Sequence, residues 1–137
     1  MFFKKPTKPH NRIDSLIGAG TRIDGDVVFS GGLRIDGHVR GNVIASDEAA
    51  CTLVLSENAT VEGEIRVSHA VINGTVVGPV HASEYLELQG KSRVKGDVHY
   101  AIIEIQVGAV VDGQLVHDQP AEAEGEKVVA LRPATGD

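Results

Sequence analysis

The chain has 137 residues, a mass of 14.5 kDa and a formal net charge of −6. That size fits one domain, and the acidic balance argues against direct nucleic-acid binding, which needs a basic face. Aromatic residues make up 4% and Trp is absent, so an interior of small aliphatic side chains is expected. The single cysteine, Cys51, excludes a disulfide framework and a cysteine-rich zinc site, and it suits a cytoplasmic location.

The chain begins with a basic segment, residues 1–14, in which four Lys/Arg face one acid. Burying a Phe-sized side chain is worth about 1.5–3 kcal/mol, and a lysine near an anionic leaflet adds about 1 kcal/mol. The segment therefore predicts a flexible head that binds anionic lipids weakly and gains avidity when many copies are joined. The predicted membrane-binding residues are Met1, Phe2, Phe3, Lys4 and Lys5. Neither a transmembrane span nor a signal peptide is expected.

A repeated unit follows, in residues 15–117: an aliphatic residue, any residue, Gly, any residue and a second aliphatic residue. The six copies span residues 23–27, 35–39, 61–65, 72–76, 94–98 and 111–115. Three of them are preceded by a further alternating aliphatic pair, which adds a second strand to the unit. Val61, Val94 and Val111 are separated by 33 and 17 residues, so the period is about 17. Alternation with period two predicts strands, because successive side chains point to opposite faces.

This period predicts an all-β solenoid of about six coils, each with three short strands, and a length of about 30 Å. Residues 47–51 interrupt the spacing and predict a lateral loop between coils, in which Cys51 is a small filler. The expected inward side chains are Ile23, Val27, Ile35, Val39, Val43, Leu53, Leu55, Val61, Ile65, Ile72, Val76, Val80, Leu86, Leu88, Val94, Val98, Ile103, Ile105, Val111 and Leu115.

The two ends of such a stack predict self-association, because each end exposes unpaired backbone groups and aliphatic core. No capping helix is evident in the sequence. We expect the contacts to involve an exposed or nearly exposed Phe29 at one end, and Ile103, Leu115 and Val116 at the other. The period leaves open whether the joints are head-to-tail, which gives a polar filament, or isologous, which gives a non-polar one.

The last segment, residues 118–137, holds five acids, two bases and two prolines, and it is expected to be a disordered acidic tail.

The sixfold repeat and the Met1-Phe2-Phe3-Lys4-Lys5 start resemble the bactofilins, which are bacterial cytoskeletal proteins, over about residues 1–117. The resemblance implies a single-stranded, right-handed parallel β-helix that polymerises without nucleotide into non-polar filaments. It also implies a peripheral location on the inner face of the cytoplasmic membrane. There the filaments recruit cell-wall or other envelope proteins that affect cell shape.

Three histidines support an alternative function, that of a metalloenzyme. His81 and His99 lie three residues after Gly78 and Gly96, and His117 lies four after Gly113, so a metal-binding column is conceivable. Trimeric zinc carbonic anhydrases and acyltransferases use left-handed solenoids. The alternative is therefore a closed trimeric metalloenzyme of that type. Its strict six-residue period does not divide a spacing of 17, so no metal site is predicted.

The remaining polar patterns indicate no chemistry. The column of polar residues after each first aliphatic has mixed charge, and it is interpreted as a solvated face. Gly18-Ala19-Gly20 lacks the third glycine of a dinucleotide fingerprint, and Gly90-Lys91-Ser92 lacks the first glycine of a phosphate-binding loop. We therefore expect no catalytic residue, no nucleotide and no cofactor, and a structural protein rather than an enzyme.

Overall fold

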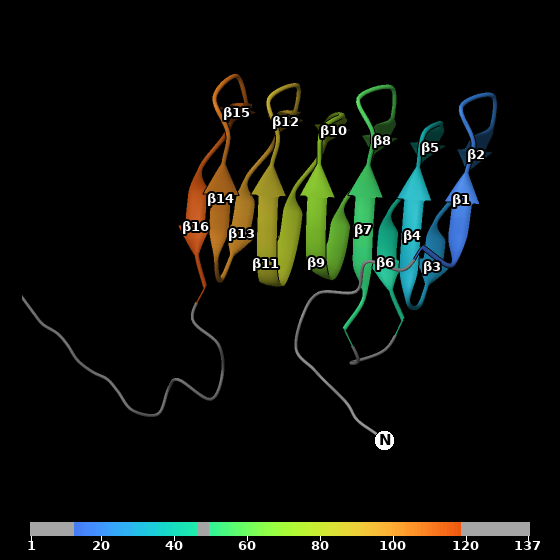
Figure 1. Cartoon of the computed structure of the whole chain (residues 1–137), viewed down its shortest axis with the longest axis horizontal. Helices are drawn as coiled ribbons and strands as arrows, with labels where there is room; N and C mark the ends of the chain where they lie inside the picture. Colours follow the sequence, from blue (N-terminus) through green and yellow to red (C-terminus); the bar gives the residue numbers. More distant parts are fainter. Residues whose placement is uncertain (1–12, 47–49, 119–137) are drawn as a thin grey trace, which may run out of the picture.

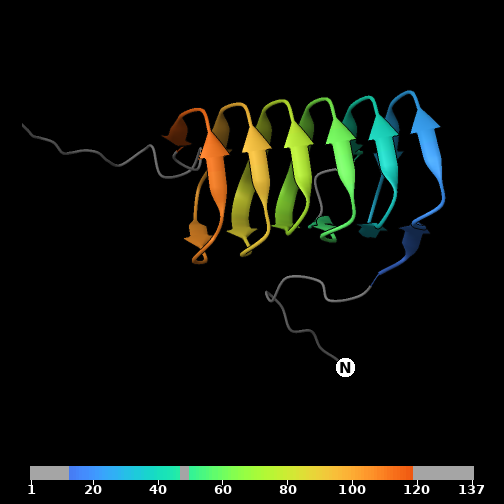
Figure 2. The ribbon, with the colours of Figure 1, turned by 90° about the horizontal axis from the view of Figure 1, so that it is seen from above.

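The computed structural model describes residues 13–46 and 50–118, and it arranges every strand of this part in one β-solenoid (Figure 1). The coils follow one another along a single axis (Figure 2). The predicted head and tail, apart from residues 13–14 and 118, lie outside the described residues, as do 47–49 of the predicted loop. The all-β solenoid of about six coils is confirmed.

Each coil has three strands, and two long strands continue from one coil into the next. In chain order the strands are β1 (Ser15–Ile17), β2 (Arg22–Asp24), β3 (Val27–Phe29), β4 (Gly32–Ile35), β5 (His38–Arg40), β6 (Val43–Ala45), β7 (Thr52–Leu55), β8 (Thr60–Glu62), β9 (Ile65–Ile72), β10 (Thr75–Val77), β11 (Val80–Leu88), β12 (Arg93–Lys95), β13 (Val98–Tyr100), β14 (Ile103–Ile105), β15 (Val110–Asp112) and β16 (Leu115–His117).

All strand pairs are parallel, and equivalent residues of successive coils lie in columns. One sheet has the order β15-β12-β10-β8-β5-β2. The other sheet covers two faces of the solenoid, because β9 and β11 each turn from one face to the next. Along the six-stranded sheet, the central residue of every strand is an inward Ile or Val, running from Ile23 in the first coil to Val111 in the last.

The core is the aliphatic interior that the repeat predicts. Fourteen of the twenty expected inward side chains are completely buried, and each contributes about 1.5–3 kcal/mol. The other six all belong to the first or last coil. Ile23, Val27, Ile103 and Val111 are half-buried, and Ile105 and Leu115 are exposed. An end coil has a neighbour on one side only, so it cannot bury all of its inward residues alone, although Ile17 and Phe29 of the first coil are buried.

The repeated glycines stack at one corner of the solenoid. A Cβ on Gly78 would lie 2.3 Å from the carbonyl oxygen of Gly63 in the preceding coil, and the φ of Gly78 is +145°. Both observations require glycine, because a side chain at this corner would push the coils apart. The same contact recurs at Gly41, Gly63, Gly96 and Gly113. These stacked glycines, four of which (Gly25, Gly63, Gly96 and Gly113) belong to the repeated unit, therefore allow the coils to approach at this corner.

Cys51 ends the segment of the expected loop and belongs to no strand, since β7 begins at Thr52. Its side chain nevertheless belongs to the hydrophobic core, its backbone NH donates to Ser68 Oγ at 2.8 Å, and its carbonyl accepts from the His69 NH at 3.0 Å. These bonds hold it against the next coil. Its interpretation as a small filler is confirmed by its burial.

Candidate functional site: the two end coils

The first coil presents one open edge. Within residues 13–46 and 50–118, β1, β2 and β3 each pair with a strand on one side only, the strand of the second coil. Leu16 and Val28 face outward from this coil and are exposed. The backbone on the free side of the three strands can accept another set of strands, as open sheet edges do.

The last coil presents the opposite edge and is more apolar. In the described part of the chain, β14, β15 and β16 pair only with the fifth coil. The inward residues Ile105 and Leu115 are 47% and 46% exposed, and Val107 is 99% exposed. This end therefore offers uncovered core as well as open backbone.

Exposed apolar side chains concentrate at these two edges. The large hydrophobic residues exposed in the described chain are Ile13, Leu16, Val28, Val77, Ile102, Ile105, Val107, Val110 and Leu115. Three of these nine belong to the first coil or its start, and five lie within 102–115. Val77, in the fourth coil, is the exception. An apolar surface restricted to the two ends of a rod indicates association along its axis.

The predicted interface residues are only partly placed as expected. Leu115 is exposed, and Ile103 and Val116 are half-buried in the last coil. The expected exposure of Phe29 is wrong, since this side chain is 7% exposed and belongs to the core. Val27 and Phe29 alternate inward along β3, opposite Val43 and Ala45, so Val28 is the residue offered to solvent. Strand alternation could have identified Val28 from the sequence. The role of Phe29, Ile103, Leu115 and Val116 in polymerisation stays a prediction.

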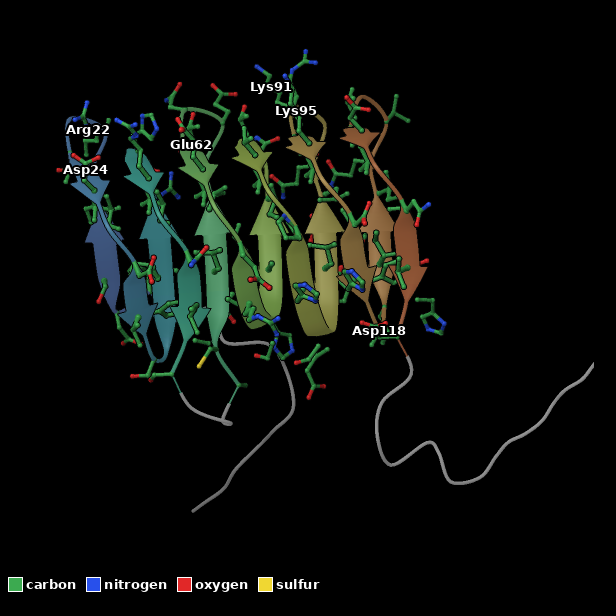
Figure 3. All side chains as sticks on the ribbon, turned by 180° about the vertical axis from the view of Figure 1, so that it is seen from behind. Arg22, Asp24, Glu62, Lys91, Lys95 and Asp118 are labelled. Atoms are coloured by element: carbon green, nitrogen blue, oxygen red, sulfur yellow. The ribbon has the colours of Figure 1, made fainter. Side chains whose placement is uncertain are left out.

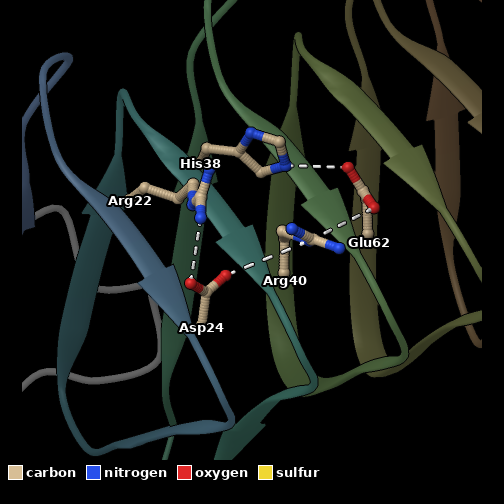
Figure 4. A network of polar contacts seen from close by, with 5 residues as sticks. All are labelled: Arg22, Asp24, His38, Arg40 and Glu62. Carbon is tan, nitrogen blue, oxygen red and sulfur yellow. Dashed lines mark hydrogen bonds and ion pairs between the residues drawn. The ribbon is translucent and has the colours of Figure 1, made fainter.

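Charged side chains form a ladder on the six-stranded sheet beside the first coil (Figure 4). Arg22 Nη2 lies 3.1 Å from Asp24 Oδ2, and Arg40 Nε lies 4.0 Å from both Asp24 and Glu62. His38 Nε2 lies 2.8 Å from Glu62 Oε2. These exposed pairs are each worth about 1 kcal/mol or less. Their alternating sign fits the expected solvated face.

Two of the three histidines of the alternative interpretation come together. The rings of His81 and His99 stack, with centroids 4.3 Å apart and an interplanar angle of 12°. Burial lowers the pKa of His81, and the neighbouring His99 and Arg66 lower it further. His117 does not join them. Its ring packs against Tyr100, with centroids 5.5 Å apart, and its Nε2 lies 3.0 Å from the carbonyl oxygen of Ala101. The column of three histidines on which the alternative rests is therefore not formed.

Sequence reasoning missed Asp118, which takes the place expected for His117. Its Oδ2 lies 3.5 Å from His99 Nδ1. Figure 3 shows it at the C-terminal end of the solenoid, opposite Arg22 and Asp24. The spacing of the histidines and Asp118 after the bend glycines could have identified Asp118. His81, His99 and Asp118 lie an odd number of residues after Gly78, Gly96 and Gly113, whereas His117 lies four after Gly113, so alternation turns His117 to the other side.

The membrane-binding prediction falls on Met1, Phe2, Phe3, Lys4 and Lys5, which lie outside the described residues. Within the described part of the chain, no helix is long and apolar enough to span a bilayer.

Comparison with known proteins identifies the family. Residues 15–116 match Bactofilin, described as polymer-forming and cytoskeletal. Bactofilin BacP of Myxococcus xanthus (strain DK1622) is 26% identical over 132 residues, which cover 95% of this chain and 53% of BacP. The chain thus spans about half the length of that relative. Bactofilin BacO of the same organism is 30% identical over 105 residues, which cover 77% of this chain and 80% of BacO. No solved structure matches. Since the family match covers almost the whole solenoid, the chain belongs to the bactofilin family of polymer-forming cytoskeletal proteins.

Proposed function

We propose that this chain is a scaffold that assembles end to end into filaments on the inner face of the cytoplasmic membrane and recruits cell-envelope proteins. The observation that carries the proposal is that, among residues 13–46 and 50–118, the large exposed apolar side chains other than Val77 lie in or beside the two end coils. Assembly would use the same kinds of contact that join the coils within one chain, namely backbone hydrogen bonds between strands and aliphatic packing. The role is structural rather than catalytic.

The contact is favourable for a physical reason. A coil stacked on the last coil would pair three strands and cover Ile105 and Leu115, which are about half exposed in the single chain. Completing the burial of each is worth about 1 kcal/mol, roughly half of the full burial of such a side chain. The burial free energy of these two side chains, together with the hydrogen bonds of three strand pairs, offsets part of the free-energy cost of association.

Nucleotide independence follows from the chemistry of this contact. Backbone pairing and apolar packing need no phosphate and no hydrolysis step. The sequence lacks both glycine-rich phosphate-binding patterns. Assembly in buffer without nucleotide is therefore expected.

The charges of the first coil favour isologous, non-polar joints. If β2 pairs antiparallel with β2 of a second copy, centred on Ile23, Arg22 of each copy lies opposite Asp24 of the other. A head-to-tail joint in continued register would instead place Asp112 of the last coil beside Asp24. Like charges directly opposite each other are destabilising, so the two-fold joint is preferred.

Membrane association is assigned to the head, whose first five residues combine three apolar side chains with two lysines. A single head binds weakly, whereas a filament presents many heads to the same anionic leaflet. Polymerisation and membrane binding should therefore reinforce each other.

Negative-stain electron microscopy of the full chain, free of nucleotide and metal, tests the proposal, with pelleting as a second readout. We expect filaments from the wild type and a small folded species from Leu115→Arg and from Val116→Arg. Val77→Arg is the matched control, because Val77 is an aliphatic residue about as exposed as Leu115 but lies in the fourth coil, and it should leave filaments intact. A uniform small oligomer from the wild type, or filaments that persist in both end-coil variants, would contradict the proposal.

A further inference from the structure

The outer face formed by β9, β11, β13 and β16 carries a stack of two imidazoles. His81 and His99 occupy equivalent positions in neighbouring coils, in register His81↔His99, so strand pairing fixes their side chains one above the other. Their rings are nearly parallel at 4.3 Å. Both side chains are about one-third exposed, so their nitrogens remain accessible from solvent.

A carboxylate approaches the stack at each end. Asp118 Oδ2 lies 3.5 Å from His99 Nδ1, and the backbone NH of Asp118 donates to the carbonyl oxygen of Tyr100 at 2.7 Å. That bond fixes where the aspartate leaves the last coil. At the other end, Glu64 Oε2 lies 3.2 Å from His81 Nε2 and 2.7 Å from Arg66 Nε. Arg66 neutralises Glu64, which leaves Asp118 as the carboxylate available for a cation.

One possible ligand atom from each of His81, His99 and Asp118 lies within 4.8 Å of the other two. Two imidazoles and a carboxylate are donors that Zn²⁺ and related divalent transition metals accept. We propose that these three residues form a Zn²⁺ site on the outer face of the solenoid, with water in the fourth position.

The required adjustment is small. In tetrahedral zinc sites with bonds of about 2.1 Å, ligand atoms lie about 3.4 Å apart. The three donors must therefore close by roughly 1.5 Å or less. Rotation of partly exposed side chains supplies this without movement of the coils. Glu64, beside His81 Nε2, can orient that ring as outer carboxylates do in metal sites.

The position of the site gives it a structural consequence. His81 belongs to the fourth coil, His99 to the fifth and Asp118 follows the last strand of the sixth. One ion would therefore tie the last coil to the two before it. Asp118 follows the last coil, in which Leu115 and Val116 are predicted assembly contacts, so zinc binding and assembly must be scored separately.

Equilibrium dialysis of the full-length, metal-stripped chain against Zn²⁺ at about pH 7.5, above the ordinary histidine pKa near 6.5, tests the site. We expect one tightly held zinc per chain, with affinity reduced about tenfold or more in each of His81→Gln, His99→Gln and Asp118→Asn. Zinc should also raise the melting temperature of the wild type, and it should not raise that of His99→Gln.

The chain supplies matched controls. His38→Gln and His117→Gln each remove a histidine elsewhere on the solenoid, and His10→Gln removes the one in the head. All three should bind zinc like the wild type. Filament formation is scored on the same samples, so failure of the zinc site and failure of assembly are separate results. Absence of tight zinc binding by the wild type, or binding unchanged in His99→Gln, would overturn the proposal.

Discussion

Replacing Gly78 with alanine tests how closely the coils must approach. The new Cβ would lie 2.3 Å from the Gly63 carbonyl oxygen and 2.8 Å from its carbon, whereas ordinary contacts begin at 3.4 Å. The neighbouring coil must therefore move by about 1 Å, an overpacking that costs about 1–3 kcal/mol. The φ of +145° adds about 1–2 kcal/mol for a residue with a Cβ. The expected loss is about 2–5 kcal/mol of the free energy of unfolding.

The assay is thermal unfolding followed by circular dichroism. Measurements in a Leu115→Arg background at fixed protein concentration keep unfolding separate from assembly. For a domain of this size, each kcal/mol lowers the melting temperature by about 4–8 °C, so Gly78→Ala should melt at least about 8 °C lower. Gly20→Ala is the control, because its Cβ would meet nothing within 4 Å. If Gly78→Ala and Gly20→Ala have the same melting temperature, the stacked glycines do not set the spacing of the coils.

The remaining predictions concern the sheet surface, the core and the head. The hydrogen bond that Tyr85 donates to Glu104 at 2.8 Å raises the Tyr85 pKa to about 12, so its small stabilising effect is complete below pH 10 and is lost as the pH rises through 12. Glu104→Gln should move this titration toward 10 in ultraviolet absorbance, and an unmoved titration would exclude Glu104 as the cause. Leu55→Ala should cost about 2–5 kcal/mol in denaturant unfolding because Leu55 is fully buried, and a loss no larger than that of Val54→Ala on the outer side would contradict the inward assignment. Removal of residues 1–5 should preserve filaments but abolish co-sedimentation with anionic liposomes. Undiminished liposome binding would show that the head is not the membrane contact.

The fold was predictable because each repeat carries its own geometry. Alternation at positions such as Val61 and Ile65 defines the inward face, and the glycine between them defines the bend, so the fully buried core follows from local pattern. The burial of residues in the two end coils was harder to predict from the sequence, because it depends on the absence of a neighbouring coil rather than on residue type. Ile105 and Ile72 are both inward isoleucines, yet only Ile72 is buried.

The side-chain clusters were harder to predict, because the side to which a residue points depends on whether it lies an odd or an even number of residues after the bend glycine. A spacing of four instead of three residues after a glycine sends His117 toward Tyr100 and leaves Asp118 beside His99. The charge ladder also needed the register, since Glu62 meets His38 and Arg40 from a neighbouring coil across the inserted residues. Sequence spacing alone does not reveal that the insertion leaves this register intact.

The direction of the backbone hydrogen bonds has a mechanical consequence. The strands lie across the rod, so their hydrogen bonds run along it, and tension on a filament would load the bonds of one coil-to-coil step together and successive steps in series. A series of steps under tension separates first at the weakest step. Within one molecule the steps are nearly equal, because the step from the second to the third coil pairs β6 with β9 over two residues but β4 with β7 over four. Coils of one molecule are also joined covalently, so under load a filament would part at a junction between molecules, and each molecule would stay intact.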